Sequence, residues 1–182
     1  RLANLGLFDK EIALQCVHMT ALNSEDISIL RNSNAHVIHC PESNLKLASG
    51  FCESDKLLKQ NINVALGTDG AASNNDLDMF SEMRTAALLG KAVSTNASAL
   101  PAGQVLQMAT INGAKALGID DITGSLEKGK LADMIAIDFS DLELQPVYNI
   151  CSQLVYTNIA HRVTHSWVNG KALMLERELQ TI

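Results

Sequence analysis

Three polar residues, His18, His39 and Asp69, carry side chains well suited to catalysis in this sequence. Each stands at the C-terminal end of a short apolar run, and such runs in alternation with helical stretches predict parallel β-strands. The C-terminal ends of parallel strands share one face, where active sites form. Imidazole and carboxylate groups are natural ligands of Zn²⁺ and Fe²⁺, and such a metal lowers the pKa of a bound water. An aspartate beside that water can orient it and move its proton.

Spacing alone leaves a structural interpretation open for each of these residues. His18 and His39 also fit hydrogen-bonded histidines at strand ends, and Asp69 in Gly-Thr-Asp-Gly also fits an ordinary turn aspartate. The other histidines are expected to be structural: His36, His161 and His165.

Two nearby segments supply more polar side chains. Segment 41–50 is unusually polar after a buried strand, as loops that bind substrate often are. Alternatively, Ser43 and Asn44 bond their own backbone in a turn. On the helix expected after the third apolar run, Glu82 or Arg84 is placed to brace the preceding loop, with an exposed helix face as the alternative.

The elements that must position these side chains follow one repeated pattern of apolar run, polar turn and helix. The expected strands are Ile12–His18, His36–Cys40 and Asn63–Gly67, and the expected helices begin after Asn23, lie around Asp55–Lys59, and run from about Leu77 to Val93. Strands that alternate with helices indicate parallel βαβ units, as in a barrel or a doubly wound sheet. The glycine-rich phosphate-binding pattern follows none of the strands, which disfavours a dinucleotide-binding fold.

The pattern changes after residue 93. One helix is expected from Gly103 to Leu117, with Gly118 as its stop. A turn and a β-rich run follow over 124–138, and further strands are expected at Ser152–Tyr156, Val163–Asn169 and Lys171–Leu175. Asn169-Gly170 is a strong two-residue hairpin signal. The last third is therefore predicted to be a small antiparallel β element that begins near residues 120–126.

Composition excludes several classes of protein. The chain has 182 residues, 47% of them apolar and 19% charged, with a net charge of −6, so it is globular rather than disordered. The acidic balance argues against a nucleic acid or an anionic membrane as partner. Apolar runs stay well short of the roughly 20 residues of a membrane-spanning helix. The four cysteines lack zinc-finger or C-x-x-C spacing, which predicts reduced thiols and a cytoplasmic location.

The first residues carry no signal-peptide pattern. Residues 1–6 are typical of the tail of a helix that ends near Gly6, so we expect the chain to start within something larger.

Two long motifs, Val37–Gly50 and Leu66–Met79, closely resemble the amidohydrolase superfamily, and within it the branch of 5-methylthioadenosine/S-adenosylhomocysteine deaminases and triazine chlorohydrolases. Segment 124–134 is similar to the stretch with which such enzymes return to a β-sandwich. The resemblance implies an α/β fold, the C-terminal part of a metal-dependent (β/α)8 TIM barrel plus part of a small β-sandwich. Residues 1–122 would hold the last three βα units with trailing helices, and residues 123–182 the sandwich portion.

The same resemblance implies roles for single residues. Asp69 matches the family's metal-ligating aspartate, which also helps to activate the attacking water. The family's other ligands, a His-x-His pair and a further His, have no counterpart here and would come from a missing N-terminal half or another chain. Many relatives carry a catalytic His where Gln15 stands, whereas this chain has His18 three residues later. Ser73 matches a position that contacts the ribose-bearing ligand in the family's deaminases. His39 lies at the mouth of the barrel and is expected to bind substrate or to stand just behind the residues that do.

The implied activity is hydrolytic deamination of adenine nucleoside thioethers with one divalent metal, Zn²⁺ first and Fe²⁺ as the alternative. A chlorohydrolase or a guanine-type deaminase would use the same metal chemistry. The other hypothesis is a catalytically incomplete fragment or scaffold that needs a partner half-barrel. The expected partners are a small nucleoside substrate and a second copy of the protein in a homodimer.

Overall fold

The computed structural model describes residues 2–181, so Arg1 and Ile182 lie outside the described part of the chain. The expected helix tail at the start is a single 3-10 turn, η1 (Ala3–Leu5), which Gly6 ends in the left-handed conformation with φ 79°. Only glycine adopts that conformation without steric cost. The short turn therefore confirms the stop at Gly6, and the part of the prediction that falls on Arg1 is not described.

A three-stranded parallel sheet forms the first layer, as the repeated pattern predicted. Its strands are β1 (Leu14–Val17), β2 (Ala35–His39) and β3 (Val64–Leu66), in the order β1-β2-β3. Their C-terminal ends lie at one edge. Polar residues that follow different strands are thereby brought close together.

The connections between these strands are helical, as right-handed parallel units require. They are α1 (Ser24–Asn32), α2 (Pro41–Lys46) and α3 (Ser54–Lys59). Asn23 caps α1 in a reciprocal capping box with Asp26, which confirms the helix start. The prediction of a loop over 41–50 is wrong for the first half of that segment, which forms helix α2. Pro41 takes the first helical position, where its fixed φ favours the helix.

Three more helices follow β3: α4 (Met79–Ser94), α5 (Ala102–Met108) and α6 (Ile111–Leu117). The prediction of one helix over 103–117 is wrong, because the chain breaks at Thr110 with φ −131° and ψ −97°. The Thr110 hydroxyl donates to the carbonyl of Leu106 at 2.7 Å and satisfies an acceptor at the end of α5. The break lets Asn112 donate a side-chain hydrogen bond to the carbonyl of Val64 in β3.

A second sheet is antiparallel and contains β4 (Met134–Ile137), β5 (Val163–Val168), β6 (Lys171–Leu175) and β7 (Glu178–Leu179) in chain order. The hairpin predicted at Asn169-Gly170 is confirmed. Both residues have positive φ, 50° and 71°, as a tight two-residue turn requires. Two 3-10 turns lie between β4 and β5 in the chain: η2 (Leu142–Leu144) and η3 (Ala160–Arg162).

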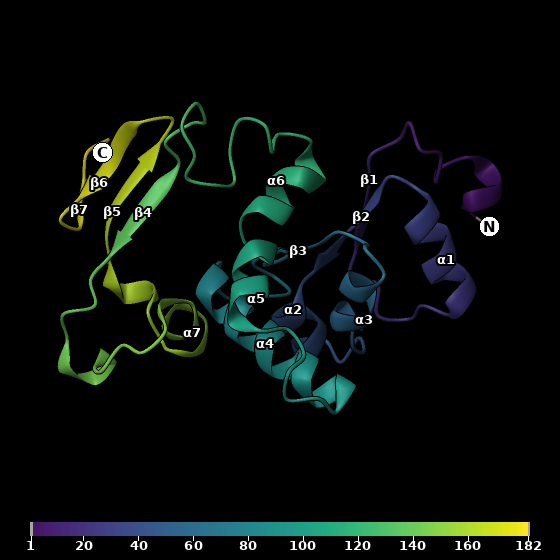
Figure 1. Ribbon diagram of the computed structural model, residues 1–182, viewed down its shortest axis with the longest axis horizontal. Helices are drawn as coiled ribbons and strands as arrows, with labels where there is room; N and C mark the ends of the chain where they lie inside the picture. Colours follow the sequence, from purple (N-terminus) through teal and green to yellow (C-terminus); the bar gives the residue numbers. More distant parts are fainter. Residues whose placement is uncertain (1, 182) are drawn as a thin grey trace.

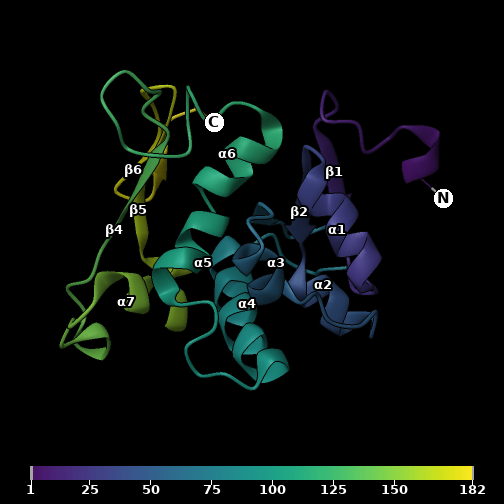
Figure 2. The ribbon, with the colours of Figure 1, turned by 45° about the vertical axis from the view of Figure 1, so that its right-hand side comes forward.

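The strand expected at Ser152–Tyr156 is wrong, because these residues belong to helix α7 (Ile150–Tyr156). The Asn149 side chain caps this helix by accepting a hydrogen bond from the Ser152 N–H. A short apolar run fits a strand or a helix equally well, and the cap decides for the helix. In both ribbon views α7 lies below the end of the second sheet and beside α5, and it packs against α4 and α5 (Figures 1 and 2).

The hydrophobic core lies between the parallel sheet and the helices. It joins fully buried Val37 and Val64 in the strands to Met108 in α5 and Val155 in α7. Burial of such a side chain contributes roughly 1.5–3 kcal/mol each, so this cluster fixes the strand ends relative to the helices. No helix within residues 2–181 has the length and apolar character needed to cross a membrane.

Candidate functional site

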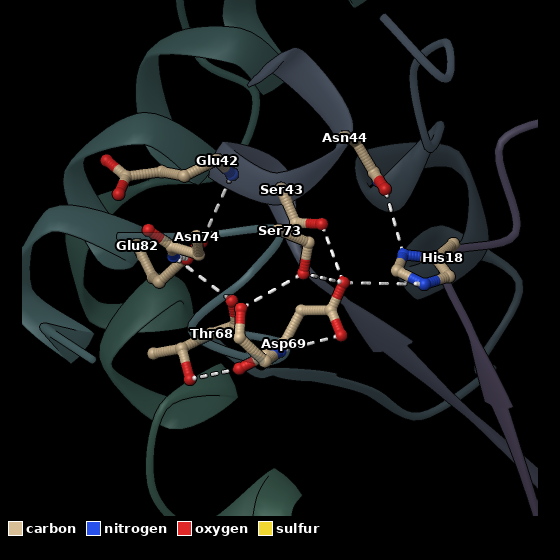
Figure 3. A network of polar contacts seen from close by, with 10 residues as sticks. His18, Glu42, Ser43, Asn44, Thr68, Asp69, Ser73, Asn74 and Glu82 are labelled. Atoms are coloured by element: carbon tan, nitrogen blue, oxygen red, sulfur yellow. Dashed lines mark hydrogen bonds and ion pairs between the residues drawn. The ribbon is translucent and has the colours of Figure 1, made fainter. Parts of the chain in front are cut away.

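Asp69 is the centre of the polar cluster at the C-terminal edge of the parallel sheet (Figure 3). It follows β3 and adopts a left-handed φ of 62°, which turns its exposed carboxylate towards α2. Oδ2 accepts hydrogen bonds from the Ser43 hydroxyl at 2.6 Å and the Ser73 hydroxyl at 2.7 Å. Oδ1 accepts from the Gly70 N–H at 2.8 Å. These bonds favour the charged form, with Ser43 first, and lower the pKa of Asp69 to about 2.

His18 lies beside this carboxylate. Its Nε2 is 3.9 Å from Asp69 Oδ2, and its Nδ1 is 2.9 Å from Asn44 Oδ1. An amide oxygen only accepts, so His18 donates to Asn44 through Nδ1, and its other ring nitrogen, Nε2, faces Asp69. Figure 3 shows the contacts from Asn44 and from Asp69 reaching different nitrogens of the ring. The site therefore pairs a fixed carboxylate with an imidazole ring that Asn44 holds in place.

Strand alternation alone would turn residues 15 and 18 to opposite faces. The structure avoids this because β1 ends at Val17 and His18 has a left-handed φ of 71°. Gln15 instead donates to the carbonyl of Ala116 in α6 at 3.2 Å. His18, rather than Gln15, is thus the residue that reaches the site.

His39 sits at the end of β2 but is only 2% exposed. In β2 the buried positions alternate, and His39 shares its parity with buried Ala35 and Val37. Its Nδ1 has no hydrogen-bond partner within the described residues. Burial, together with the charge of nearby His18, lowers the pKa of His39 to about 4, so the ring is neutral. This position fits a residue behind the site, and its substrate contact stays a prediction.

Ser43 and Asn44 do not simply bond their own backbone, as the turn alternative supposed. Both are buried on α2, and their side chains contact Asp69 and His18. The signal that could have found them is their position, because polar residues in the first turn after a parallel strand face the same edge as the residues that follow neighbouring strands. Ser73 likewise contacts Asp69, and its predicted contact with substrate is not tested by this geometry.

Of the two residues expected to brace the loop, Glu82 does so and Arg84 does not. Glu82 has no exposed surface, and its Oε1 accepts from Asn74 Nδ2 at 2.7 Å. Its Oε2 accepts from the Glu42 N–H at 3.3 Å. Burial raises the pKa of Glu82 to about 7. Arg84 is exposed on the outer side of α4.

The remaining histidines lie outside this cluster. His36 is at the start of β2, where its Nδ1 is 3.0 Å from Asn63 Nδ2. His161 and His165 belong to η3 and β5, as expected for packing or surface positions. All four cysteines are free thiols, in accord with the prediction.

The donor set allows a test of whether these residues fit a divalent metal. Asp69 offers an ionised carboxylate, and His18 Nε2 lies 3.9 Å from it. Among residues 2–181, no three His, Cys, Asp or Glu side chains are grouped so as to hold a metal. Asp69 is therefore suited to be one carboxylate ligand of a metal, and a complete ligand set would need side chains beyond the described residues.

Comparison with known proteins shows the family to which this chain belongs. A sequence profile of the amidohydrolase family matches residues 1–173. This chain belongs to the amidohydrolase family. It is 59% identical over 182 residues, its whole length, to 5-methylthioadenosine/S-adenosylhomocysteine deaminase of Saccharophagus degradans. It is 46% identical over 181 residues to 5′-deoxyadenosine deaminase of Methanosarcina mazei.

Solved amidohydrolases share the fold. An adenosine deaminase from Xanthomonas campestris, crystallised with bound zinc, matches 100% of the chain with a TM-score of 0.96 and 50% identity. A zinc-containing variant of atrazine chlorohydrolase from Arthrobacter aurescens, in complex with atraton, matches 100% of the chain with a TM-score of 0.91 and 25% identity. The chain spans only 40% to 41% of the length of these four proteins.

Proposed function

We propose that this amidohydrolase chain is the C-terminal portion of a metal-dependent deaminase of adenine nucleosides that carry a 5′-thioether. The identity of 59% to a deaminase named for such substrates, against 25% to a chlorohydrolase, supports the deaminase over the chlorohydrolase. In this proposal β1, β2 and β3 are the last three strands of a (β/α)8 barrel. A barrel of that kind needs about 250 residues, so the other strands come from outside this chain.

The observation that carries the proposal is the fixed carboxylate of Asp69 beside the free nitrogen of His18. Asp69 would hold a divalent metal as one ligand, zinc by analogy with two of the solved relatives. When bound, that metal would supply Lewis acidity and lower the pKa of water. Asp69 would orient the attacking water, and His18 Nε2 is placed to accept or return a proton.

The reaction then balances without a further reactant. Water adds its oxygen to C6 of the purine. One of its protons ends on N1 of the ring, and the other passes through the site residues to the 6-amino group. That group leaves as ammonia, and the product is the corresponding 6-oxopurine nucleoside. Ser43 and Ser73 would keep the Asp69 carboxylate in place during this exchange.

The test is a substrate comparison on the natural full chain, with the metal content measured on the same sample. Release of ammonia is expected from 5′-methylthioadenosine and S-adenosylhomocysteine, with higher kcat/KM than from guanine. Chloride release from atrazine is expected to be far slower. If chloride release is the faster reaction, the chlorohydrolase alternative replaces this proposal. If a metal-loaded sample releases neither ammonia nor chloride, the hypothesis of a catalytically incomplete scaffold replaces this proposal.

A further inference from the structure

Glu82 is a buried carboxylate with no compensating cation. It lies in the first turn of α4 with no exposed surface. None of the ion pairs found within residues 2–181 includes it. Burial of an unpaired carboxylate opposes folding, and an apolar side chain of similar volume would pack at lower cost. The residue therefore needs an explanation beyond packing.

One oxygen of Glu82 fixes the turn that carries Asp69. Oε1 accepts from Asn74 Nδ2 at 2.7 Å, and the same amide nitrogen donates its second hydrogen to the carbonyl of Thr68 at 3.0 Å. Asn74 is itself 5% exposed, so both bonds are shielded from water. Thr68 immediately precedes Asp69, and its carbonyl position sets the direction of the Asp69 backbone. Figure 3 shows this line of contacts from Glu82 through Asn74 to the turn.

The other oxygen of Glu82 fixes the start of α2. Oε2 accepts from the Glu42 N–H at 3.3 Å, one of the N–H groups that a helix start leaves without a partner. The next two residues, Ser43 and Asn44, make the contacts to Asp69 and to His18. A single carboxylate thus ties together the two segments that meet at the site.

We propose that Glu82 is a positioning residue: through Asn74 and the start of α2 it holds the Asp69 turn in register with Ser43 and His18. This inference rests on the proposed function, because it takes Asp69 as the working carboxylate. Glu82 itself does not touch the reacting atoms. Its effect is on the geometry of the Asp69 carboxylate, and hence on turnover and on the retention of the metal that Asp69 would help to hold.

The variants are Glu82→Gln and Asn74→Ala in the natural full chain. Glutamine has one acceptor oxygen, so it can satisfy either Asn74 or the Glu42 N–H but turns its own NH₂ towards the other donor. Asn74→Ala removes both bonds of the first path and leaves α2 attached. Arg84→Gln is the matched control, because Arg84 is exposed two residues along the same helix. If Glu82→Gln fails to fold, Asn74→Ala carries the test.

The readouts are kcat and KM for 5′-methylthioadenosine, the rate of zinc loss to a coloured chelator, and Tm. Both variants are expected to lower kcat by about 10- to 100-fold with a smaller change in KM, and to lose zinc faster than Arg84→Gln. The double variant is expected to lose less kcat than the two single losses combined, because Asn74 reaches the Asp69 turn through the contact that it shares with Glu82. The inference is overturned if the variants have a lowered Tm but the same kcat and rate of zinc loss as the control. It is also overturned if the two single effects on kcat are fully additive in the double variant.

Asp69→Asn separates this inference from the proposed function. If Asp69→Asn abolishes turnover while the Glu82 and Asn74 variants behave like Arg84→Gln, only the positioning inference fails. If Asp69→Asn keeps wild-type turnover and zinc content, the proposed function fails and takes this inference with it.

Discussion

The hydroxyl of Ser43 donates a hydrogen bond of 2.6 Å to Asp69 Oδ2, although the two residues follow different strands of the parallel sheet. Ser73 donates to the same oxygen from within the Asp69 turn at 2.7 Å. The carboxylate is therefore held from two independent segments before any substrate arrives. A group that is already oriented needs little reorganisation during the reaction, which is where enzymes gain much of their electrostatic advantage.

Asp69→Asn is expected to lower kcat/KM for 5′-methylthioadenosine by on the order of 10³-fold or more and to reduce bound metal. An amide is neutral, and its NH₂ would oppose the Ser43 and Ser73 hydroxyls. Ammonia release and metal analysis on the natural full chain measure both effects. Asp121→Asn, at an exposed position, is the control. Wild-type turnover in Asp69→Asn would show that Asp69 has no role in catalysis.

His18→Gln is expected to lower kcat by about 10²- to 10⁴-fold with the fold intact, because the variant loses the ring nitrogen that faces Asp69 and can exchange a proton. The side chain is 41% exposed, so the substitution leaves little cavity. The matched control is His161→Gln, whose side chain is 52% exposed in η3. Steady-state kinetics on both variants decide the matter: equal kcat values contradict a catalytic role for His18.

Glu82 is expected to make the stability of the protein depend on pH. Its pKa rises from the ordinary 4.5 to about 7 through burial, and the carboxylates of Glu42 and Asp76 add to the rise. Between these values the unfolded chain ionises first and binds fewer protons, so the free energy of unfolding falls as pH rises from 4.5 to 7 and then levels off. The fall due to this group is about 3 kcal/mol.

Urea unfolding of the wild type and Glu82→Gln across this pH range measures the contribution of Glu82. Because glutamine does not titrate, the difference in unfolding free energy between the two proteins is expected to change steadily from pH 4.5 to 7. Two parallel curves would show that Glu82 titrates normally.

Gly90→Ala is expected to destabilise the protein by about 1–3 kcal/mol. A Cβ at residue 90 would lie 2.4 Å from Leu100 Cδ1 and 2.9 Å from its Cγ, and Leu100 is fully buried and has no room to move. Gly103→Ala is the opposite case, because a Cβ on this α5 residue meets nothing within 4 Å. It is expected to stabilise the helix by about 0.4–1 kcal/mol. Denaturant midpoints that shift in the same direction for both variants contradict this packing argument.

The parallel part of the fold could be predicted because local signals agree there. The apolar runs of β2 and β3 predict strands, and the capping residues that begin at Asn23 predict the start of α1, and the structure contains each of these elements. The second half was less predictable. The run at Ser152–Tyr156 has no local feature that separates strand from helix, and the cap from Asn149 decides only once the preceding turn is known.

The sequence was enough to predict the two main residues of the site, but not the side chains that hold them in place. Asp69 and His18 follow apolar runs, so the topology of parallel strands brings them together. The left-handed φ of His18 turns its ring to the site, and nothing in the neighbouring sequence signals it, because only a small minority of residues other than glycine adopt a positive φ. The contacts of Ser43 and Asn44 depend on α2, whose polar sequence resembles a loop.

Helix α7 has a consequence for how this part of the family can change over evolution. The chain leaves the helical layer for β4, comes back in α7 to place Val155 in the core, and leaves again for β5. A recombination that replaced everything after residue 122 would bring in a foreign α7 against the face of α5. The second sheet is therefore inherited together with part of the first core, and substitutions on α5 and α7 are expected to covary.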